Sequence, residues 1–216
     1  MSIQENLLSI RKMLPQHVTL VAVSKTKPIA DLMEAYEVGQ RIFGEDKIQE
    51  MAEKAEAMPK DIQWHMIGHV QSNKVKFMAP FVSLIHGVDS LKLLEEINKQ
   101  AFKNNRTINC LLQMHIAMED TKFGLDEQEL NDLLSSDQYR NLKNITVCGL
   151  LGMATFTENQ DQIKAEFDFL KSTFDKYATE NKNFTTLSMG MSGDFQLAID
   201  CGSTMVRIGS SIFGAR

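Results

Sequence analysis

Short apolar runs alternate with longer amphipathic stretches along almost the whole chain. Eight runs have the length and the apolar content of strands that are buried on both faces; they cover residues 18–24, 41–44, 62–68, 83–88, 108–117, 145–153, 185–190 and 205–210. Helical patterns precede and separate these runs, at residues 2–14, 29–38, 46–58, 71–78, 91–103, 127–134, 159–179 and 193–201. Buried strands that alternate with helices predict a parallel sheet, because parallel neighbours need crossover connections.

The number of strands indicates how that sheet is organised. Eight strands with right-handed crossovers can close into a (β/α)8 barrel of the TIM type, to which the helix at 2–14 is an N-terminal addition. The clearest helix, within 159–179, places its large apolar side chains on one face at spacings of four and three, as a helix packed on a sheet requires: Ile163, Phe167, Leu170, Phe174 and Tyr177. We therefore expect an α/β barrel, with an open doubly wound sheet as the alternative.

Composition and charge favour one compact domain that handles a small molecule. The 216 residues are 43% hydrophobic and contain no linker-like segment, so we expect a single domain over residues 1–216. The net charge is 23 − 28 = −5 without a basic run, which argues against a nucleic-acid partner. No segment approaches ~20 uninterrupted apolar residues, so we expect no membrane partner. Three cysteines without CxxC spacing fit a reducing compartment, and we expect a cytoplasmic protein.

Chemically distinctive residues follow several of the predicted strands. In a barrel of parallel strands the carboxyl ends form the active face, and the residues found there are Lys25, Glu45, His69, Met153, Ser188 and the run 209–211. Lys25 ends the apolar run of LVAVSKTKP (20–28). Many lysines at strand ends only extend into water. At the mouth of a barrel, however, a lysine amine can form an imine with an aldehyde.

The loops that follow the last two predicted strands are rich in glycine and serine. SMGMSGD (188–194) follows the seventh strand and GSS (209–211) follows the eighth. These two loops form the usual phosphate pocket of TIM barrels, where glycines let backbone N–H groups approach an anion and hydroxyl groups add donors. A helix that begins near Ser192 would add its dipole. A lysine beside a phosphate pocket predicts a phosphorylated aldehyde as the ligand.

Seven ordered segments carry a resemblance that spans the chain: LVAVSKTKP (20–28), FGEDKIQE (43–50), WHMIGHVQSNK (64–74), TKFG (121–124), GLLGMA (149–154), LSMGMSGD (187–194) and AIDCGSTMVRIGSSIFGAR (198–216). They resemble the pyridoxal 5′-phosphate (PLP) homeostasis proteins, the YggS/PROSC group. The resemblance implies a barrel like the N-terminal domain of alanine racemase, which is PLP fold type III. It also implies that PLP is held as a Schiff base on Lys25.

The resemblance also assigns roles to individual residues. It gives Ser188, Gly209 and Ser210 to the phosphate and Arg207 to the neighbourhood of the pyridine nitrogen, and it adds further cofactor-binding residues at Asp46, His69, Met153, Gly190 and Met191. A ring nitrogen that accepts from a guanidinium stays largely unprotonated, which weakens PLP as an electron sink. The family motif FGEN reads FGED here, and a tyrosine that commonly follows it is replaced by Lys47. Asp46 keeps the hydrogen-bond acceptors and adds a negative charge.

The function predicted from these residues is to hold PLP and to take part in PLP (vitamin B6) and amino-acid homeostasis, with no catalytic residues. PLP-dependent apoenzymes are expected partners, and the chain is expected to be a monomer or a weak dimer. The alternative is an amino-acid racemase, which needs a second base; in the racemases that resemble this fold, that base is a tyrosine from a further domain. The tyrosines of this chain, Tyr36, Tyr139 and Tyr177, fall in helical or post-helical positions. A pure protein-interaction module would need neither the lysine nor the phosphate loops.

His65 and His69 have the four-residue spacing of a helical metal-binding pair, but they do not lie on a predicted helix. Ligands four residues apart share a face on a helix, whereas these two flank the end of a predicted strand. We therefore predict no metal site, and we assign His69 to the barrel mouth and His65 to a partly buried position. None of the three cysteines has a histidine nearby in the predicted arrangement, which argues against a catalytic thiol.

Overall fold

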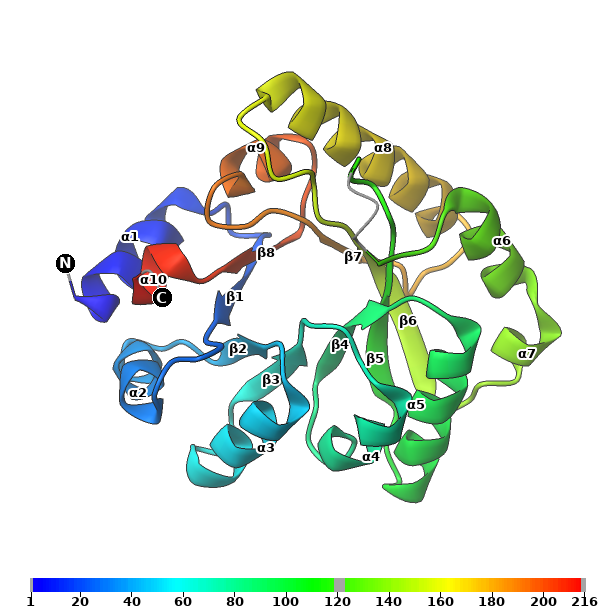
Figure 1. Cartoon of the computed structure of the whole chain (residues 1–216), viewed down its shortest axis with the longest axis horizontal. Coiled ribbons are helices and arrows are strands. Elements are labelled where there is room, and N and C mark those ends of the chain that lie inside the picture. Colours follow the sequence, from blue (N-terminus) through cyan, green and yellow to red (C-terminus); the bar gives the residue numbers. More distant parts are fainter. Residues whose placement is uncertain (1, 119–122, 215–216) are drawn as a thin grey trace.

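The eight predicted strands form a closed parallel barrel in sequence order. The computed structural model describes residues 2–118 and 123–214 (Figure 1). The strands are β1 (Thr19–Val23), β2 (Ile42–Glu45), β3 (Gln63–Met66), β4 (Leu84–Val88), β5 (Ile108–Gln113), β6 (Ile145–Leu151), β7 (Thr186–Ser188) and β8 (Met205–Ile208). Each strand pairs with its neighbours, and β1 closes the circle on β8, with Val21 beside Arg207. The prediction of a barrel is confirmed, and the open-sheet alternative is wrong.

Helices surround the barrel at the predicted places. They are α1 (Ile3–Met13), α2 (Ile29–Glu37), α3 (Ile48–Ala57), the 3₁₀ turn η1 (Ser72–Lys74), α4 (Val75–Met78), α5 (Leu91–Lys103), α6 (Glu127–Ser135), α7 (Asp137–Arg140), α8 (Gln160–Ala178), α9 (Phe195–Asp200) and α10 (Ser210–Phe213). Sequence reasoning missed α7 and α10, because four residues are too few to show a period. It also read 71–78 as one helix, where the structure has η1 followed by α4.

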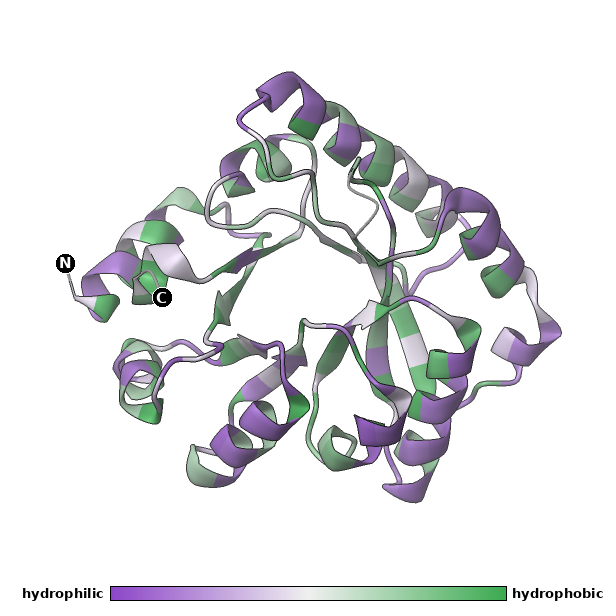
Figure 2. Ribbon diagram, viewed as in Figure 1, coloured by the Kyte–Doolittle hydropathy of each residue, from purple (hydrophilic) through white to green (hydrophobic). Residues whose placement is uncertain are grey.

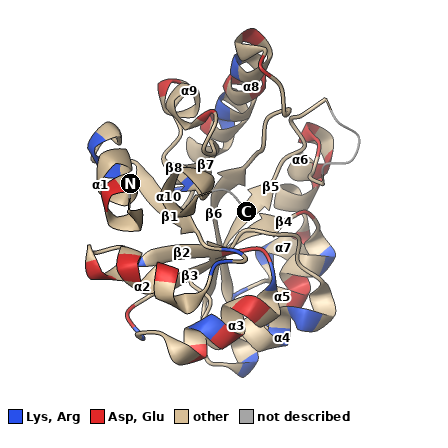
Figure 3. Cartoon of the chain, turned by 60° about the vertical axis from the view of Figure 1, so that its left-hand side comes forward, with Lys and Arg blue, Asp and Glu red and all other residues tan. Residues whose placement is uncertain are grey.

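The apolar faces of the helices pack on the outside of the barrel. On α8 the first four residues of the predicted stripe, Ile163, Phe167, Leu170 and Phe174, are buried, and the fifth, Tyr177, is half-buried against the same core. Figure 2 shows that the large helices carry both hydrophobic and hydrophilic residues, as expected of helices that pack on the barrel with one face and meet solvent with the other. Figure 3 shows that charged residues of both signs lie mainly on the helices and loops. None of the helices within the described ranges is long and apolar enough to cross a membrane.

The predicted N-terminal helix packs outside the barrel, against α10 and α2. It begins with a capping box in which Ser2 accepts from the amide of Glu5 and Glu5 accepts from the amide of Ser2. Asn6 Nδ2 donates to the carbonyl oxygen of Ile212 at 3.0 Å, which ties α1 to α10, the helix that follows β8. Figure 1 shows the two helices side by side. The first and last described helices therefore support each other beside β1 and β8.

Candidate functional site

Lys25 lies at the carboxyl end of β1, beside a carboxylate from the next strand. Its Nζ is 3.0 Å from Oδ2 of Asp46, and the side chains are 32% and 29% exposed. Asp46 follows β2 directly, so both residues stand on the same edge of the barrel. The other carboxylate oxygen of Asp46, Oδ1, is buried and has no hydrogen-bond partner among the described residues. The amine is thus held at the mouth while still in contact with solvent.

Gly68 makes room for Asp46. A Cβ at position 68 would lie 2.5 Å from the carbonyl oxygen of Asp46 and 2.7 Å from its Cα. Both are backbone atoms, which cannot move aside cheaply. The glycine of the segment WHMIGH is therefore required by the close approach of the loop that carries Asp46.

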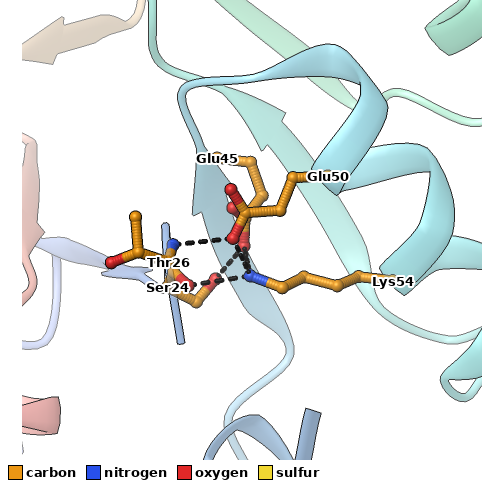
Figure 4. Close-up of polar contacts among 5 residues, drawn as sticks. All are labelled: Ser24, Thr26, Glu45, Glu50 and Lys54. Atoms are coloured by element: carbon orange, nitrogen blue, oxygen red, sulfur yellow. Dashed lines mark hydrogen bonds and ion pairs between the residues drawn. The ribbon is translucent and has the colours of Figure 1, made fainter. Parts of the chain in front are cut away.

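The two residues that flank Lys25 are fixed by side chains from β2 and α3 (Figure 4). Ser24 Oγ donates to Oε1 of Glu45 at 2.5 Å, and the amide of Thr26 donates to Oε1 of Glu50 at 2.6 Å. Thr26 has a φ of 63°, in the left-handed region that β-branched residues strongly disfavour. The backbone on both sides of Lys25 is therefore held in one conformation.

Lys54 of α3 joins these contacts into one buried cluster. Its Nζ donates to the carbonyl oxygen of Ser24 at 2.8 Å, to Oε1 of Glu45 at 2.8 Å and to Oε1 of Glu50 at 2.7 Å. Lys54 is 5% exposed and Glu45 is fully buried. Burial raises the pKa of the Glu45 carboxyl, although the hydrogen bonds from Lys54 and Ser24 act in the opposite direction. Within the described part of the chain, Oε2 of Glu45 has no hydrogen-bond partner.

Arg207 and Ser188 form a second buried group, on the side of the barrel made by β7 and β8. Nη1 of Arg207 donates to the hydroxyl of Ser188 at 2.7 Å and to its carbonyl oxygen at 3.0 Å, and Nη2 donates to the carbonyl oxygen of Gly152 at 3.3 Å. Burial lowers the pKa of Arg207 to about 10. The guanidinium is therefore still a cation at neutral pH, and it can only donate.

Two histidines extend this group across the barrel. Nδ1 of His86 lies 3.4 Å from the hydroxyl of Ser188, and Nε2 of His86 lies 3.0 Å from Nδ1 of His65. Burial lowers the pKa of His65 to about 3 and that of His86 well below its ordinary value, so both rings are neutral at neutral pH. Since Arg207 only donates, the hydroxyl proton of Ser188 is left to bond His86 Nδ1, and His86 then donates from Nε2 to His65.

The loops after β7 and β8, for which a phosphate pocket was predicted, are joined to each other by hydrogen bonds. The amide of Gly209 donates to Oγ of Ser192 at 3.3 Å, and the amide of Arg207 donates to the carbonyl oxygen of Gly190 at 3.0 Å. Gly190 has a φ of 98°, and a Cβ there would lie 2.7 Å from Cβ of Ala198. A glycine is therefore needed at position 190 for both conformation and space.

The helix that was expected to begin near Ser192 begins later. Residues 192–194 form a turn in which Oδ1 of Asp194 accepts from the amide of Met191 at 2.6 Å, and α9 starts only at Phe195. The helix that opens directly after β8 is α10, whose first residue is Ser210. The amides at the start of a helix have no carbonyl partner within it.

Two further residues predicted for the site, His69 and Met153, lie around the mouth, and His65, which was predicted to be partly buried, lies beneath it. His69 is exposed; its Nδ1 is 3.6 Å from Oδ2 of Asp89, and its ring stacks on Phe123 with centroids 4.5 Å apart. Met153 is half-buried just after β6. His65 is buried in the barrel and bonds to His86, not to His69. No group of three or more potential ligands among the described residues could hold a metal ion.

Sequence reasoning missed several residues that organise the site. His86 was hidden in the apolar run of β4, where nothing marks it as different from a core residue. Lys54 left a clearer signal, because it follows Ile48 and Met51 at intervals of three on the buried face of α3. A charged residue on an apolar face must find partners inside the protein. Lys122 of the TKFG segment lies outside the described residues.

The geometry defines the class of protein: a TIM-type barrel with a lysine amine and two hydrogen-bonded, glycine-containing loops at its carboxyl end. The chain matches the family described as "Alanine racemase, N-terminal domain" over residues 1–216. The alanine racemase of Clostridium difficile shares this fold, with a TM-score of 0.77, 14% identity and coverage of 100% of this chain and 56% of the racemase.

More similar proteins are named for PLP. A "Pyridoxal phosphate homeostasis protein" of Pasteurella multocida is 38% identical, over 100% of this chain and 98% of the relative. PipY of Synechococcus elongatus, solved without PLP, has a TM-score of 0.93 with 34% identity, over 99% of this chain and 100% of PipY; the structure of PipY with PLP bound has a TM-score of 0.88. The chain belongs to the family of pyridoxal phosphate homeostasis proteins.

Proposed function

We propose that this chain binds PLP as a Schiff base on Lys25 and holds it for PLP and amino-acid homeostasis. The observation that carries the proposal is the position of the Lys25 amine at the same end of the barrel as the two joined loops after β7 and β8, which we propose bind the phosphate. Lys27 Nζ donates to the carbonyl oxygen of Phe213 at 3.0 Å, so the loop of Lys25 abuts α10 of the pocket. The PLP-bound structure of PipY, a relative of similar length, supports the same ligand here.

The donor set suits PLP at both ends of that molecule. The amine nitrogen of Lys25 would bond the aldehyde carbon, and one water would leave. The phosphate would lie against the loops of Gly190, Met191, Gly209 and Ser210, where glycines admit backbone N–H groups and Ser210 adds a hydroxyl at the start of α10. We assign Asp46, His69 and Met153 to the rim of the cofactor. A contact between Ser188 and the phosphate stays a prediction, since its buried hydroxyl already accepts from Arg207.

Two features favour holding the cofactor over racemising amino acids. Arg207 is a cation that can only donate, so a ring nitrogen beside it would stay unprotonated, and PLP would be a weak electron sink. The three tyrosines lie on outer helices, with Tyr36 in α2, Tyr139 in α7 and Tyr177 in α8, and none follows a strand at the mouth. Incubation with L- or D-alanine in deuterated water tests this point, because exchange of the α-proton at an enzyme-like rate would favour the racemase alternative.

Delivery of PLP to PLP-dependent apoenzymes is a further part of the proposal. It is tested by mixing the PLP-loaded protein with an apoenzyme and comparing the rate of activation with that given by free PLP at the same concentration. A monomer or weak dimer is expected in sedimentation. The cysteines Cys110, Cys148 and Cys201 are free thiols, which supports residence in the cytoplasm.

Borohydride reduction followed by peptide mapping tests the central assignment. The parent protein should show the absorption of an imine with PLP and carry one reduced label on the Lys25 peptide. Lys25→Ala should lose both the imine absorption and the label. Without PLP, it should unfold at the same temperature as the parent. Lys47→Ala is the matched control, because Lys47 is an exposed lysine next to Asp46. A label found mainly on Lys47 or Lys122 would overturn the assignment.

A further inference from the structure

Both peptide units that adjoin Lys25 are tied to a single helix, α3. On one side the carbonyl oxygen of Ser24 accepts from Lys54 Nζ at 2.8 Å, and on the other side the amide of Thr26 donates to Oε1 of Glu50 at 2.6 Å. Figure 4 shows the two contacts converging from α3 on the loop after β1. Lys25 thus stands between two fixed points, while its own side chain reaches the mouth of the barrel.

Lys54 uses its full hydrogen-bonding capacity in this arrangement. An ammonium group has three N–H donors, and Nζ has three acceptors within 2.8 Å: the carbonyl oxygen of Ser24 and one oxygen each of Glu45 and Glu50. A surface lysine four residues from a glutamate would keep its head group in water, but Lys54 is 5% exposed. Its position is therefore set by the interior contacts and not by solvent.

The strain at Thr26 shows that the loop needs such a restraint. Its φ of 63° is disfavoured for a β-branched residue, and a strained backbone persists only where its surroundings hold it. The carboxylate of Glu50 accepts from the amide of this same residue. Without that acceptor, Thr26 would relax toward a negative φ and turn the peptide that carries Lys25.

We propose that Lys54 and Glu50 are positioning residues for Lys25: together they fix the backbone on both of its sides and so direct its amine to the cofactor. The inference rests on the proposed function, in which that amine bonds the aldehyde carbon of PLP with loss of one water. Such a bond forms quickly only if nitrogen and carbon meet in the right geometry, and a misplacement near 1 Å can slow a reaction about a hundredfold.

Glu50 offers the cleaner test of this proposal. Lys54 has two partners in the interior, and its removal threatens the fold, whereas the side chain of Glu50 is 23% exposed. Glu50→Ala removes the acceptor for Thr26, while Glu50→Gln keeps an oxygen in its place. Glu53→Ala is the matched control, since Glu53 lies exposed on the same helix.

Three measurements on each variant separate positioning from stability. They are the rate at which the imine absorption appears on adding PLP, the exchange of the Thr26 amide in the ligand-free protein, and thermal unfolding without PLP. Glu50→Ala should slow imine formation about tenfold or more. It should also speed exchange at Thr26, with a melting temperature within about 4 °C of the parent. Glu50→Gln and Glu53→Ala should stay close to the parent in all three.

The outcomes distinguish this inference from the proposed function on which it rests. Imine formation and Thr26 exchange in Glu50→Ala that equal those of the parent would overturn the positioning role, while PLP binding by Lys25 would stand. If Glu50→Gln slowed imine formation as much as Glu50→Ala, the positioning role would also be overturned, because Glu50→Gln retains an acceptor for the Thr26 amide. If the parent itself forms no imine, the proposed function fails, and unchanged exchange at Thr26 would then refute the restraint on the loop independently.

Discussion

Replacing Lys54 with methionine should destabilise the ligand-free protein strongly. The change keeps an unbranched side chain but removes the only cation that contacts the carboxylate of Glu45 among the described residues. Glu45 is fully buried; in the part of the chain that the structure describes, it would retain only Ser24 as a donor at Oε1, and it has no partner at Oε2. Removing one partner of a buried ion pair typically costs about 3–5 kcal/mol. We expect a loss in this range, most of it from Glu45, since Glu50 is partly exposed.

A second substitution should recover part of that loss. Glu45→Gln in the Lys54→Met background removes the uncompensated charge and keeps an oxygen for Ser24 Oγ. The double variant should therefore be more stable than Lys54→Met alone by about 1 kcal/mol or more. The free energies of unfolding would come from urea titration at neutral pH, with equal slopes as the check that the unfolded states are comparable. Lys60→Met is the control, because Lys60 is exposed and donates to carbonyl oxygens at the end of α3.

The deficit of Lys54→Met should also depend on pH in a definite direction. Burial raises the pKa of Glu45 in the folded protein, and loss of Lys54 removes an interaction that lowers it. The folded variant then binds a proton more tightly than its unfolded chain, so its stability relative to the parent is greatest in acid. The stability that protonated Glu45 contributes is lost as the pH rises from the pKa of Glu45 in the unfolded chain to its raised pKa in the folded variant. A deficit no larger than that of Lys60→Met, or one that shrinks as pH rises, would refute this reasoning.

Three further outcomes follow from the β7–β8 side of the site. Ser210→Ala should weaken PLP binding by about 1–3 kcal/mol, measured by equilibrium dialysis, because the phosphate loses a donor. Ser188→Ala should also weaken PLP binding, because it removes the contact with Arg207. Unchanged affinity in both variants would mean that these loops are ordinary turns. Gly190→Ala should destabilise the fold by about 1–3 kcal/mol in urea unfolding, while Gly193→Ala, which has no atom within 4 Å of its added Cβ, should not. Arg207→Glu should retain some PLP and exchange the α-proton of alanine faster than the parent; a folded, loaded variant that exchanges no faster would contradict the electronic role of Arg207.

The barrel was predictable because its parallel strands are buried on both faces. The runs VTLVAVS and ITVCGLL carry few polar residues, and this pattern survives any local error in their boundaries. The same topology brings the carboxyl ends of all strands to one edge, so Lys25 and Asp46 had to lie near each other once the barrel was assigned. The helices α7 and α10 were not predictable in this way, because four residues are too few to show a helical period.

The buried polar groups were much less predictable, because their partners are distant in sequence. Lys54 meets Ser24 only after β1 and β2 have paired, and His86 meets Ser188 across the closed barrel. A pattern of apolar and polar positions shows that Lys54 is buried, but it does not show which oxygens surround it. The position of a charge on an apolar face was the one signal in the sequence for that cluster.

The two sides of the mouth differ in charge, and the difference suggests how PLP is oriented. On the side of Lys25, the cation of Lys54 contacts the carboxylates of Glu45 and Glu50, and Lys25 itself pairs with Asp46, so that three carboxylates accompany two lysines. The buried cation of Arg207 has only carbonyl oxygens and a hydroxyl as acceptors in the described structure. Asp194 acts on this cation electrostatically, but all of the hydrogen-bond acceptors described for it are neutral. A buried cation of this kind attracts an anion or a lone pair. The phosphate and the ring nitrogen of PLP would therefore be drawn to the side of β7 and β8, which leaves the aldehyde to face Lys25.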